Sequence, residues 1–390
     1  MKKVKLGEDE IFLARRIRLI PTPEQETQFW KSVGVARWAY NFFLSENKMV
    51  YECTGRTITG AEVRKAINNV LKPNTHKWLK EVSSNVMKQA IKDAENALYN
   101  FFNHFSRYPK YKTKHKSKPS FYVNYESLHK TNIGFIGERL GEVRTSEPLP
   151  SIPNNSHYYR PRITYDGKFW YLSVVFVSKR KKESLTSDIF GIDLGIKEFA
   201  VLSNQDASVN KLYGNINKTA EVRRLKRKLK RVSRKHSRKV LANKSQGRNL
   251  RDCSNLEKQR QEMASIYRRL TDIRNNYLHQ IAAEIVKAKP SKVVMEDLNV
   301  SGMMKNKHLA DKIMEQKWKT FRNIMTYKCD MYGIDIEFVP MFYPSSKTCS
   351  NCGHIKKDLK LSDRSYVCPE CGLVIDRDLN AAINLANYNS

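Results

Sequence analysis

The sequence predicts a multidomain α/β fold. Its 390 residues exceed one ordinary domain, and 40% hydrophobic content is enough for about two to four packed units. Apolar residues recur at helical spacing through residues 23–106, whereas short alternating runs typical of strands begin at Phe121. Beyond residue 188, apolar strands alternate with long helical patterns. We therefore expect a mostly helical unit, a β unit and an α/β unit.

The first two elements are a strand and a helix. Residues 11–20 alternate apolar and basic side chains in their second half, which favours a strand. Thr22 can cap the helix that follows, Pro23 fits its first position and Gln25 completes a capping box. A second apolar stripe over residues 86–105 predicts another helix.

A β unit follows the helical block. Residues 162–177 predict a β-hairpin on a tight Asp166-Gly167 turn. We expect the strand at residues 11–20 to join this unit, which makes the helical block an insertion. A polar, basic stretch at residues 178–188 marks the boundary to the next unit.

The α/β unit begins with two apolar strands in residues 189–202. Residues 221–240 contain eleven Lys or Arg, and Val222, Leu225, Leu229, Val232 and His236 are spaced 3, 4, 3, 4. This pattern predicts a helix with a narrow apolar seam and an intensely basic outer face. A second helix, over residues 266–285, leads into a buried strand at residues 292–298.

Four cysteines near the C-terminus have the spacing of a metal site. Cys349-Ser-Asn-Cys352 is separated by fifteen residues from Cys368-Pro-Glu-Cys371, and a glycine follows each pair. Four thiolates at tetrahedral geometry suit one structural Zn²⁺ ion, and the glycines suit knuckle turns around it. From the cysteines alone, a zinc ribbon that only stabilises the fold is the better interpretation.

The other three cysteines, Cys53, Cys253 and Cys329, show no pairing pattern. We expect them to be reduced thiols in a cytoplasmic protein. No stretch approaches the roughly 20 apolar residues of a membrane span, and nothing indicates secretion.

The charge of the chain points to a polyanionic partner. Seventy-one Lys and Arg against thirty-nine Asp and Glu give a net charge of +32, and nucleic acid is the expected ligand. Candidate contacts on an aromatic, basic loop are Arg107, Tyr108, Lys110 and Lys112. Candidate contacts on the basic helix are Arg223, Arg224, Arg227, Lys228, Arg231, Arg234 and Lys235. The alternatives are a solvated flexible loop and a solvated helix face.

Three carboxylates are placed where the fold would bring them together. Asp193 lies in one predicted strand, Glu296 ends another, and Asp378 opens a helix after the cysteines. An unpaired buried carboxylate is costly, so a hard divalent cation is the economical partner. Two Mg²⁺ ions about 4 Å apart would activate a water and stabilise the leaving oxygen of a phosphodiester. For each acid alone, a role as a turn former or in strand-end solvation is the alternative.

The motifs around these acids resemble a known family. Gly191-Ile-Asp193-Leu-Gly195, Val294-Met-Glu296-Asp297-Leu298 and Asp376-Arg-Asp378-Leu-Asn380-Ala-Ala resemble the three split motifs of a RuvC-type, RNase H-like nuclease. With Ser345-Ser-Lys-Thr-Cys349-Ser-Asn-Cys352-Gly-His354 between the last two, the pattern resembles TnpB. TnpB proteins are insertion-sequence-encoded, RNA-guided nucleases related to type V CRISPR effectors.

The resemblance implies a domain layout. The segments are a wedge-like β-barrel of residues 1–20 and 117–183, a helical recognition domain of residues 21–116, a RuvC-like nuclease domain of residues 184–344 and 373–390, and a zinc-ribbon insertion of residues 345–372 that binds the target nucleic acid.

The resemblance also implies an activity. Asp193, Glu296 and Asp378 take the catalytic positions and bind two Mg²⁺ ions. Asp376 is the competitor of Asp378, and Asp297 is interpreted as a supporting or strand-end residue. The partners implied are a guide RNA from the transposon end and double-stranded DNA with a short adjacent motif, which a single site cuts. The action would be on the nucleoid of a bacterium or archaeon.

Three other functions remain open at this point. A nuclease-inactive repressor would have lost at least one of the three acids. A strand-transfer transposase uses the same superfamily fold, but without a zinc ribbon between the last two acids. A compact type V CRISPR effector would carry the same motifs, and only genomic context separates it from a transposon protein.

Overall fold

The computed structural model describes residues 6–114, 116–153, 156–181, 183–250, 253–341, 343–360 and 363–388. The chain divides into two compact units, Phe12–Ser178 and Met1–Ile11 with Lys179–Ser390. The outermost ends of the predicted first and last domain segments, residues 1–5 and 389–390, lie outside the described residues. In the described part of the chain, no helix has both the length and the apolar character needed to cross a membrane.

Two long helices form the centre of the unit Phe12–Ser178. Helix α1, Pro23–Thr54, begins with the predicted capping box, in which Thr22 and Gln25 exchange hydrogen bonds of 3.0 and 3.3 Å. Helix α4, Ser84–Phe102, packs against α1 through its buried apolar face. The predicted stripe extended to Phe105, but the helix ends earlier because His104 has a left-handed backbone (φ 59°). Shorter helical segments between them are α2 (Gly60–Ala66), η1 (Ile67–Leu71), α3 (Lys72–Asn74) and η2 (Lys77–Glu81).

A seven-stranded sheet covers these helices, in the order β2-β6-β7-β1-β5-β4-β3. Its strands are β1 (Glu10–Ile20), β2 (Ser120–Tyr122), β3 (His129–Lys130), β4 (Gly134–Gly137), β5 (Gly141–Thr145), β6 (Tyr159–Tyr165) and β7 (Trp170–Lys179), with the short 3-10 helix η3 (Tyr125–Ser127) after β2. As predicted, β1 joins the later strands and the helical block is inserted after it. The predicted hairpin is β6–β7, but its loop holds four residues rather than two, because the last pair is Tyr165 with Trp170.

The predicted closed barrel is not found among the described strands. β2 and β3 are the two edges of the sheet and do not pair with each other. A sheet closes when its apolar face must be filled by its own side chains. Here α1 and α4 fill that face, and Phe29 of α1 packs on Phe121 of β2 and Trp170 of β7.

The second unit is built on a five-stranded sheet in the order β10-β9-β8-β11-β12. Its strands are β8 (Ile189–Leu194), β9 (Glu198–Ser203), β10 (Asn210–Gly214), β11 (Lys292–Glu296) and β12 (Asp335–Val339). β8, β9 and β10 are antiparallel neighbours, whereas β11 runs parallel to both β8 and β12. β10 and β12 were not predicted.

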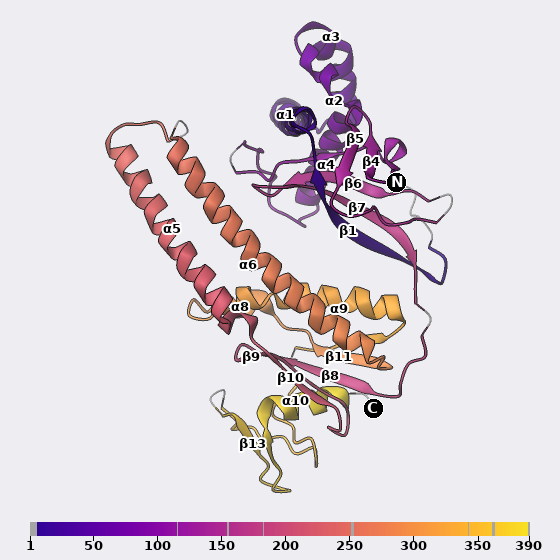
Figure 1. The fold of residues 1–390 in the computed structure, drawn as a ribbon, viewed down its shortest axis with the longest axis vertical. Coiled ribbons are helices and arrows are strands. Elements are labelled where there is room, and N and C mark those ends of the chain that lie inside the picture. Colours follow the sequence, from indigo (N-terminus) through magenta and orange to yellow (C-terminus); the bar gives the residue numbers. More distant parts are fainter. Residues whose placement is uncertain are drawn as a thin grey trace. The chain divides into compact units, whose positions relative to one another are not determined.

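Helices cover both faces of this sheet (Figure 1). Helices α6 (Ser254–Lys287) and α9 (Trp318–Tyr332) pack on one face, and α10 (Arg377–Ala386) packs on the other. The short segments η4 (Ile216–Lys218), α7 (Val300–Met303) and α8 (Ala310–Gln316) join these layers, and β13 (Ser365–Val367) pairs with β14 (Val374–Asp376) near the cysteines. A side chain that points out of either face of this sheet therefore meets a helix.

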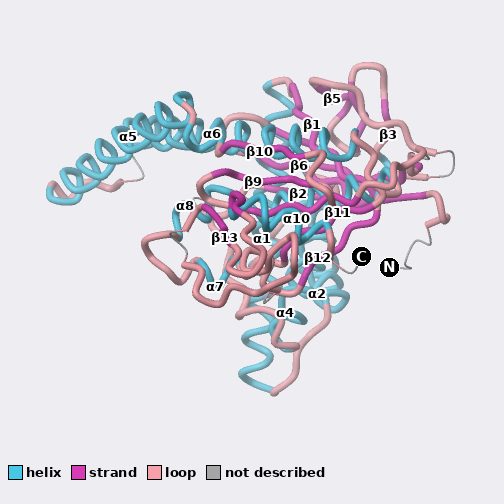
Figure 2. The backbone as a smooth tube through the Cα atoms, turned by 90° about the horizontal axis from the view of Figure 1, so that it is seen from below, coloured by secondary structure: helices cyan, strands magenta, loops and turns pink. Residues whose placement is uncertain are grey.

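The predicted basic helix is α5, Ala220–Ser245, which forms an antiparallel pair with α6. Figure 2 shows the end of α5 and the start of α6 lying side by side, away from the sheet. A small apolar seam joins the two helices, with Val222, Val232 and Leu270 buried in it. The outer face of α5 is left to solvent.

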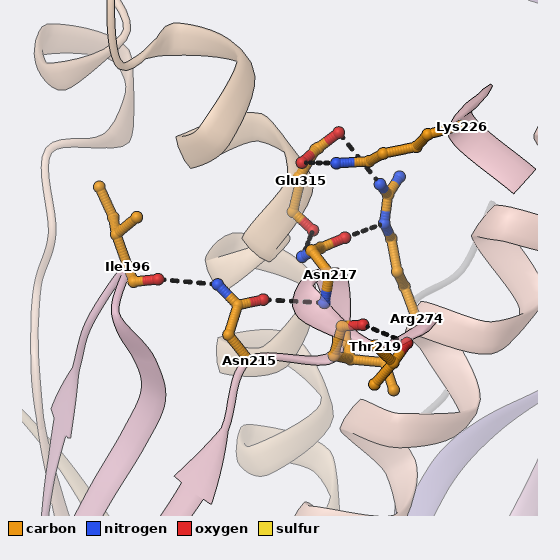
Figure 3. A network of polar contacts seen from close by, with 8 residues as sticks. Ile196, Asn215, Asn217, Thr219, Lys226, Arg274 and Glu315 are labelled. Atoms are coloured by element: carbon orange, nitrogen blue, oxygen red, sulfur yellow. Dashed lines mark hydrogen bonds and ion pairs between the residues drawn. The ribbon is translucent and has the colours of Figure 1, made fainter. Parts of the chain in front are cut away.

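A polar network fixes the base of this helix pair (Figure 3). Asn215 donates to the carbonyl of Ile196 at 2.7 Å, and Arg274 of α6 donates to Asn217 at 2.7 Å. Glu315 of α8 pairs with Arg274 at 3.3 Å. Ile196 lies in the turn that follows β8, so the basic helix pair is connected to the strand that carries Asp193.

Candidate active site and cysteine cluster

The register of two parallel strands places two of the predicted acids side by side. Val294 of β11 pairs with Gly191 of β8, and Met295 pairs with Ile192. One step further along this register brings Glu296 beside Asp193. Because side chains alternate along a strand, both acids point to the face that carries Gly191 and Val294.

Helix α10 packs directly on that face. A Cβ atom at Gly191 would lie 2.0 Å from the carbonyl oxygen of Ala382 and 2.4 Å from the amide of Ala386. Real Cβ atoms do not approach backbone this closely, so only glycine allows the helix to reach the strand. Asp378 stands in the first turn of this helix. The third acid therefore comes from an element pressed against the strand that carries the first.

Asp193 lies within electrostatic reach of both other carboxylates. Burial raises the pKa of Asp193 well above its usual range, and the neighbouring charges of Glu296 and Asp378 raise it further. Burial also raises the pKa of Glu296, against a hydrogen bond from Ser345 and the positive charge of Arg377. Like charges gathered in a low-dielectric place need a cation, and three carboxylates suit a hard divalent ion. The residues present thus fit a Mg²⁺ site.

The carboxylates do not enclose a single ion closely. Among the described residues, the four cysteines form the sole group of three or more His, Cys, Asp or Glu side chains that converge as the ligands of one metal would. The three acids are spread more widely, as expected if their charges repel. A site for two ions about 4 Å apart also distributes its ligands over a larger volume than a one-ion site.

Two other acids near the site have structural partners. Asp376 caps α10, because its Oδ1 accepts hydrogen bonds from the amides of Asp378 (2.9 Å) and Leu379 (3.1 Å). Asp297 forms an ion pair with Arg322, whose guanidinium lies 3.9 Å from the centre of the Phe338 ring. Asp376 still contributes to the negative charge around Asp193, but its Oδ1 is engaged in the cap of α10.

A cavity of about 430 Å³ opens beside Glu296. Polar and cationic side chains line it together with apolar ones from β8, α7 and α9. The polar and cationic members are Asn299, Ser301, Lys319, Arg322 and Asn323. Of the three acids, Glu296 alone lines this cavity, whose cationic side chains could hold a negatively charged chain beside it.

The cysteine cluster has the geometry of a tetrahedral site. The four Sγ atoms lie within 4.8 Å of one another, with 3.6 Å between Cys349 and Cys371 and 3.5 Å between Cys352 and Cys368. Zn–S bonds of about 2.3 Å at tetrahedral angles require sulfurs about 3.8 Å apart. The glycines after each pair, Gly353 (φ 75°) and Gly372 (φ 72°), have the left-handed backbone of knuckle turns. The cluster fits one Zn²⁺ ion.

Two buried asparagines attach the cysteine cluster to α10. Asn380 donates to the carbonyl of Thr348 at 2.7 Å and accepts from the amide of Ser350 at 2.9 Å. Asn384 donates to the carbonyls of Thr348 and Ser345 at 2.6 and 2.7 Å. The Ser345 hydroxyl donates in turn to Glu296. One short loop therefore connects the cysteines, the helix that bears Asp378 and the Glu296 carboxylate.

These connections predict the effect of removing zinc ligands. Replacing Cys352 and Cys371 together with serine should abolish zinc binding and lower the melting temperature, because metal binding contributes directly to the stability of such a site. Cys53→Ser removes an exposed thiol outside the cluster and should change neither zinc binding nor the melting temperature. Zinc content by atomic emission and thermal melting measure both effects. A double variant that keeps one zinc per chain and its melting temperature would contradict the assignment.

The predicted nucleic-acid contacts fall into two groups. All seven residues on α5 and the loop residues Arg107, Tyr108 and Lys110 are exposed. Lys112 is not, because its ammonium lies 3.8 Å from the centre of the Tyr40 ring and is half-buried. Residues that the sequence analysis missed are Ser345, Arg377 and Asn384. Their roles depend on partners distant in sequence, so no local pattern indicates them.

Three protein-family models match the chain. Residues 173–307 match a family described as "Probable transposase", and residues 318–385 match "Cas12f1-like, TNB domain". Residues 12–56 match a model described as "Helix-turn-helix domain". Over these last residues the structure has most of strand β1 and the single long helix α1, rather than two helices.

Known proteins resemble the chain over nearly its whole length. A Streptomyces pristinaespiralis protein named "Putative RNA-guided DNA endonuclease" is 30% identical, over 95% of this chain and 88% of its own. The Escherichia coli K12 protein named "Putative RNA-guided DNA endonuclease InsQ" is 25% identical, over 95% and 91%. Among solved structures, a Cas12f1–sgRNA–target DNA complex has the same fold, with a TM-score of 0.57, 14% identity and coverage of 97% and 99%.

Proposed function

Because this chain belongs to the family of TnpB-like RNA-guided DNA endonucleases, we propose that it is itself an RNA-guided endonuclease that cuts double-stranded DNA. The observation that carries this proposal is the placement of Asp193 and Glu296 on neighbouring strands, under the helix α10 that carries Asp378. A DNA-binding protein without catalysis has no use for three carboxylates that repel each other and nucleic acid.

The catalytic domain is proposed to be a RuvC-type, RNase H-like domain. Three antiparallel strands followed by two parallel ones, with helices on both faces, support that assignment. Its proposed segments are residues 184–344 and 373–390, with the zinc ribbon at residues 345–372. Residues 1–20 and 117–183 would form the wedge-like domain, as an open sheet, and residues 21–116 the helical recognition domain.

Two Mg²⁺ ions are the proposed catalytic cofactors, and when bound they would supply water activation and stabilisation of the leaving oxygen. Asp193, Glu296 and Asp378 would hold them. Ser345 orients Glu296 through its hydrogen bond, and Asp376 fixes the first turn of α10 and hence the position of Asp378. Lys319 and Arg322, in the cavity beside Glu296, would hold the phosphates that flank the scissile bond. Because a single triad is visible, one site would cut both strands in turn.

The exposed basic face of α5 is the proposed contact for the guide RNA or its heteroduplex with DNA. Reversing the charges of Arg224, Arg227 and Arg231 should lower affinity for RNA and flatten its dependence on salt, because fewer counterions are released. For a single strand the slope should fall by about 0.7 for each phosphate that the protein no longer neutralises. The measurement is RNA binding across a salt series. An unchanged slope would exclude this face as the contact.

The proposed function is tested by sequencing the RNA that co-purifies with the protein. We expect the protein, purified from cells that carry its native locus, to contain a transposon-end transcript that sequencing identifies. This complex should cut DNA that matches the variable end of that transcript. Purified protein without any bound RNA would favour a direct DNA-binding role instead.

A further inference from the structure

A cationic cavity lies within the unit Phe12–Ser178. It has a volume of about 310 Å³ and is bounded by α1, α4, the loop after α4, β2 and β6. Five cationic side chains and one carboxylate line it. They are Arg37, Lys112, Lys114, Lys118, Arg162 and Asp93. The cavity therefore has a large excess of positive charge.

The one carboxylate is fully engaged. Both oxygens of Asp93 accept from Arg162 at 2.8 Å, and Gln89 donates to one of them at 2.9 Å. A carboxylate held in this way neutralises a single guanidinium. The other four cations that line the cavity, Arg37, Lys112, Lys114 and Lys118, share no further carboxylate among its lining residues.

The side chain of Lys112 is one of the cations without a nearby carboxylate. Its backbone is fixed by Asn41, which donates to the Lys112 carbonyl at 2.8 Å and accepts from its amide at 2.7 Å. Within the described residues, no carboxylate lies within 4 Å of the Lys112 ammonium, and its close partner is the Tyr40 ring. Burial lowers the pKa of Lys112, against the attraction of Asp93. The Lys112 backbone is thus fixed beside the cavity, and its half-buried ammonium has an aromatic ring rather than a carboxylate close by.

The wall of the cavity has room for a ligand. Gly34 lies in the middle of α1, and a Cβ atom there would meet nothing within 4 Å. A glycine in the interior of a helix lowers the stability of that helix. Because no neighbouring atom excludes a side chain at Gly34, packing within the protein does not explain the glycine, and space for a ligand would. Trp30, one turn earlier, also lines the cavity and is 42% exposed. Its ring packs edge to face with Tyr165 and Trp170, at centroid distances of 5.1 and 4.9 Å, and its exposed part offers a surface on which a base can stack.

We propose that this cavity binds the phosphate group of a nucleotide, with the base of that nucleotide on Trp30. A phosphate is the anion that a cluster of Arg and Lys recognises best. In the working protein the nucleotide would belong to a bound RNA or DNA strand, so the proposal rests on the proposed function only in requiring a nucleic-acid ligand. A free nucleotide is the other source of the same chemistry.

Binding should be measured with the full chain carrying Asp193→Ala, so that cleavage plays no part. The probes are a fluorescent 20-nucleotide RNA, the corresponding single-stranded DNA, and AMP. Lys112→Gln should weaken oligonucleotide binding by roughly tenfold and reduce the salt slope by about 0.7, because one phosphate fewer is neutralised. Gly34→Leu should weaken binding similarly, because it fills the cavity while every charge remains.

The matched control is Lys92→Gln, which removes the same charge from the exposed side of α4. It should change affinity less than twofold. Circular dichroism melting establishes that each variant is folded, and Gly34→Leu should melt no lower than the parent because leucine favours a helix. Loss of oligonucleotide binding supports a strand phosphate, and loss of AMP binding alone supports a free nucleotide. If Lys112→Gln and Gly34→Leu bind all three probes like Lys92→Gln, the proposal is wrong.

Discussion

Replacing Asp193 with alanine should abolish cleavage of both DNA strands and leave RNA-directed DNA binding intact. The charges of both Glu296 and Asp378 act on this buried carboxylate, so its loss should remove a shared ligand of the proposed metal ions. Metal ions contribute several kcal/mol to such reactions, so the cleavage rate should fall by roughly 10³-fold or more. Gel assays with separately labelled strands measure both cuts.

The control separates catalysis from folding. Because a buried carboxylate among other carboxylates destabilises the metal-free protein, Asp193→Ala should melt at the same temperature as the parent or higher. Asp272→Ala removes an exposed acid from α6 and should cut both strands at the parent rate. Persistence of either cut in Asp193→Ala would refute the single-site model.

The second large effect is expected from Gly191→Ala. Its new methyl group would lie 2.0 Å from the carbonyl oxygen of Ala382, so α10 has to move away from β8. We expect a loss of about 3 kcal/mol or more in the free energy of unfolding, and a loss of cleavage because Asp378 moves with the helix. Chemical denaturation and the cleavage assay measure the two effects.

A matched glycine gives the control for this variant. A Cβ atom at Gly214 would have its nearest neighbour at 3.7 Å, an ordinary contact, so Gly214→Ala should cost less than about 1 kcal/mol. The group that obstructs the methyl is backbone, so Ala382→Gly should not rescue Gly191→Ala. A Gly191→Ala protein as stable and active as Gly214→Ala would show that α10 does not need to approach β8 so closely.

Local signals predicted several elements, among them the two strands that carry Asp193 and Glu296. The capping box at Thr22, the apolar runs of β8 and β11 and the seam of α5 each lie within a single helix or strand, and each is present. Helix α9 could have been found as well, because Trp318, Phe321 and the buried residues after them recur at helical spacing. These features depend on the periodicity of a single element.

Features set by distant partners could not be predicted. In strand β10 only Tyr213 is buried, so its sequence has no alternation, and it forms because its backbone pairs with β9. The hydrogen bond from Ser345 to Glu296 joins residues far apart in the chain. Lys112 was predicted to lie on an exposed loop, but the packing of that loop against α1 buries half of it.

The most direct test of the central claim is to change the guide. The complex of protein and co-purified RNA should be reconstituted with the variable end of the RNA replaced by a new sequence. RNA-guided cleavage predicts that both cuts move to DNA that matches the new guide, beside the same adjacent motif, and that Asp193→Ala abolishes them. Cuts that stay at the original site, or that occur without RNA, would contradict it.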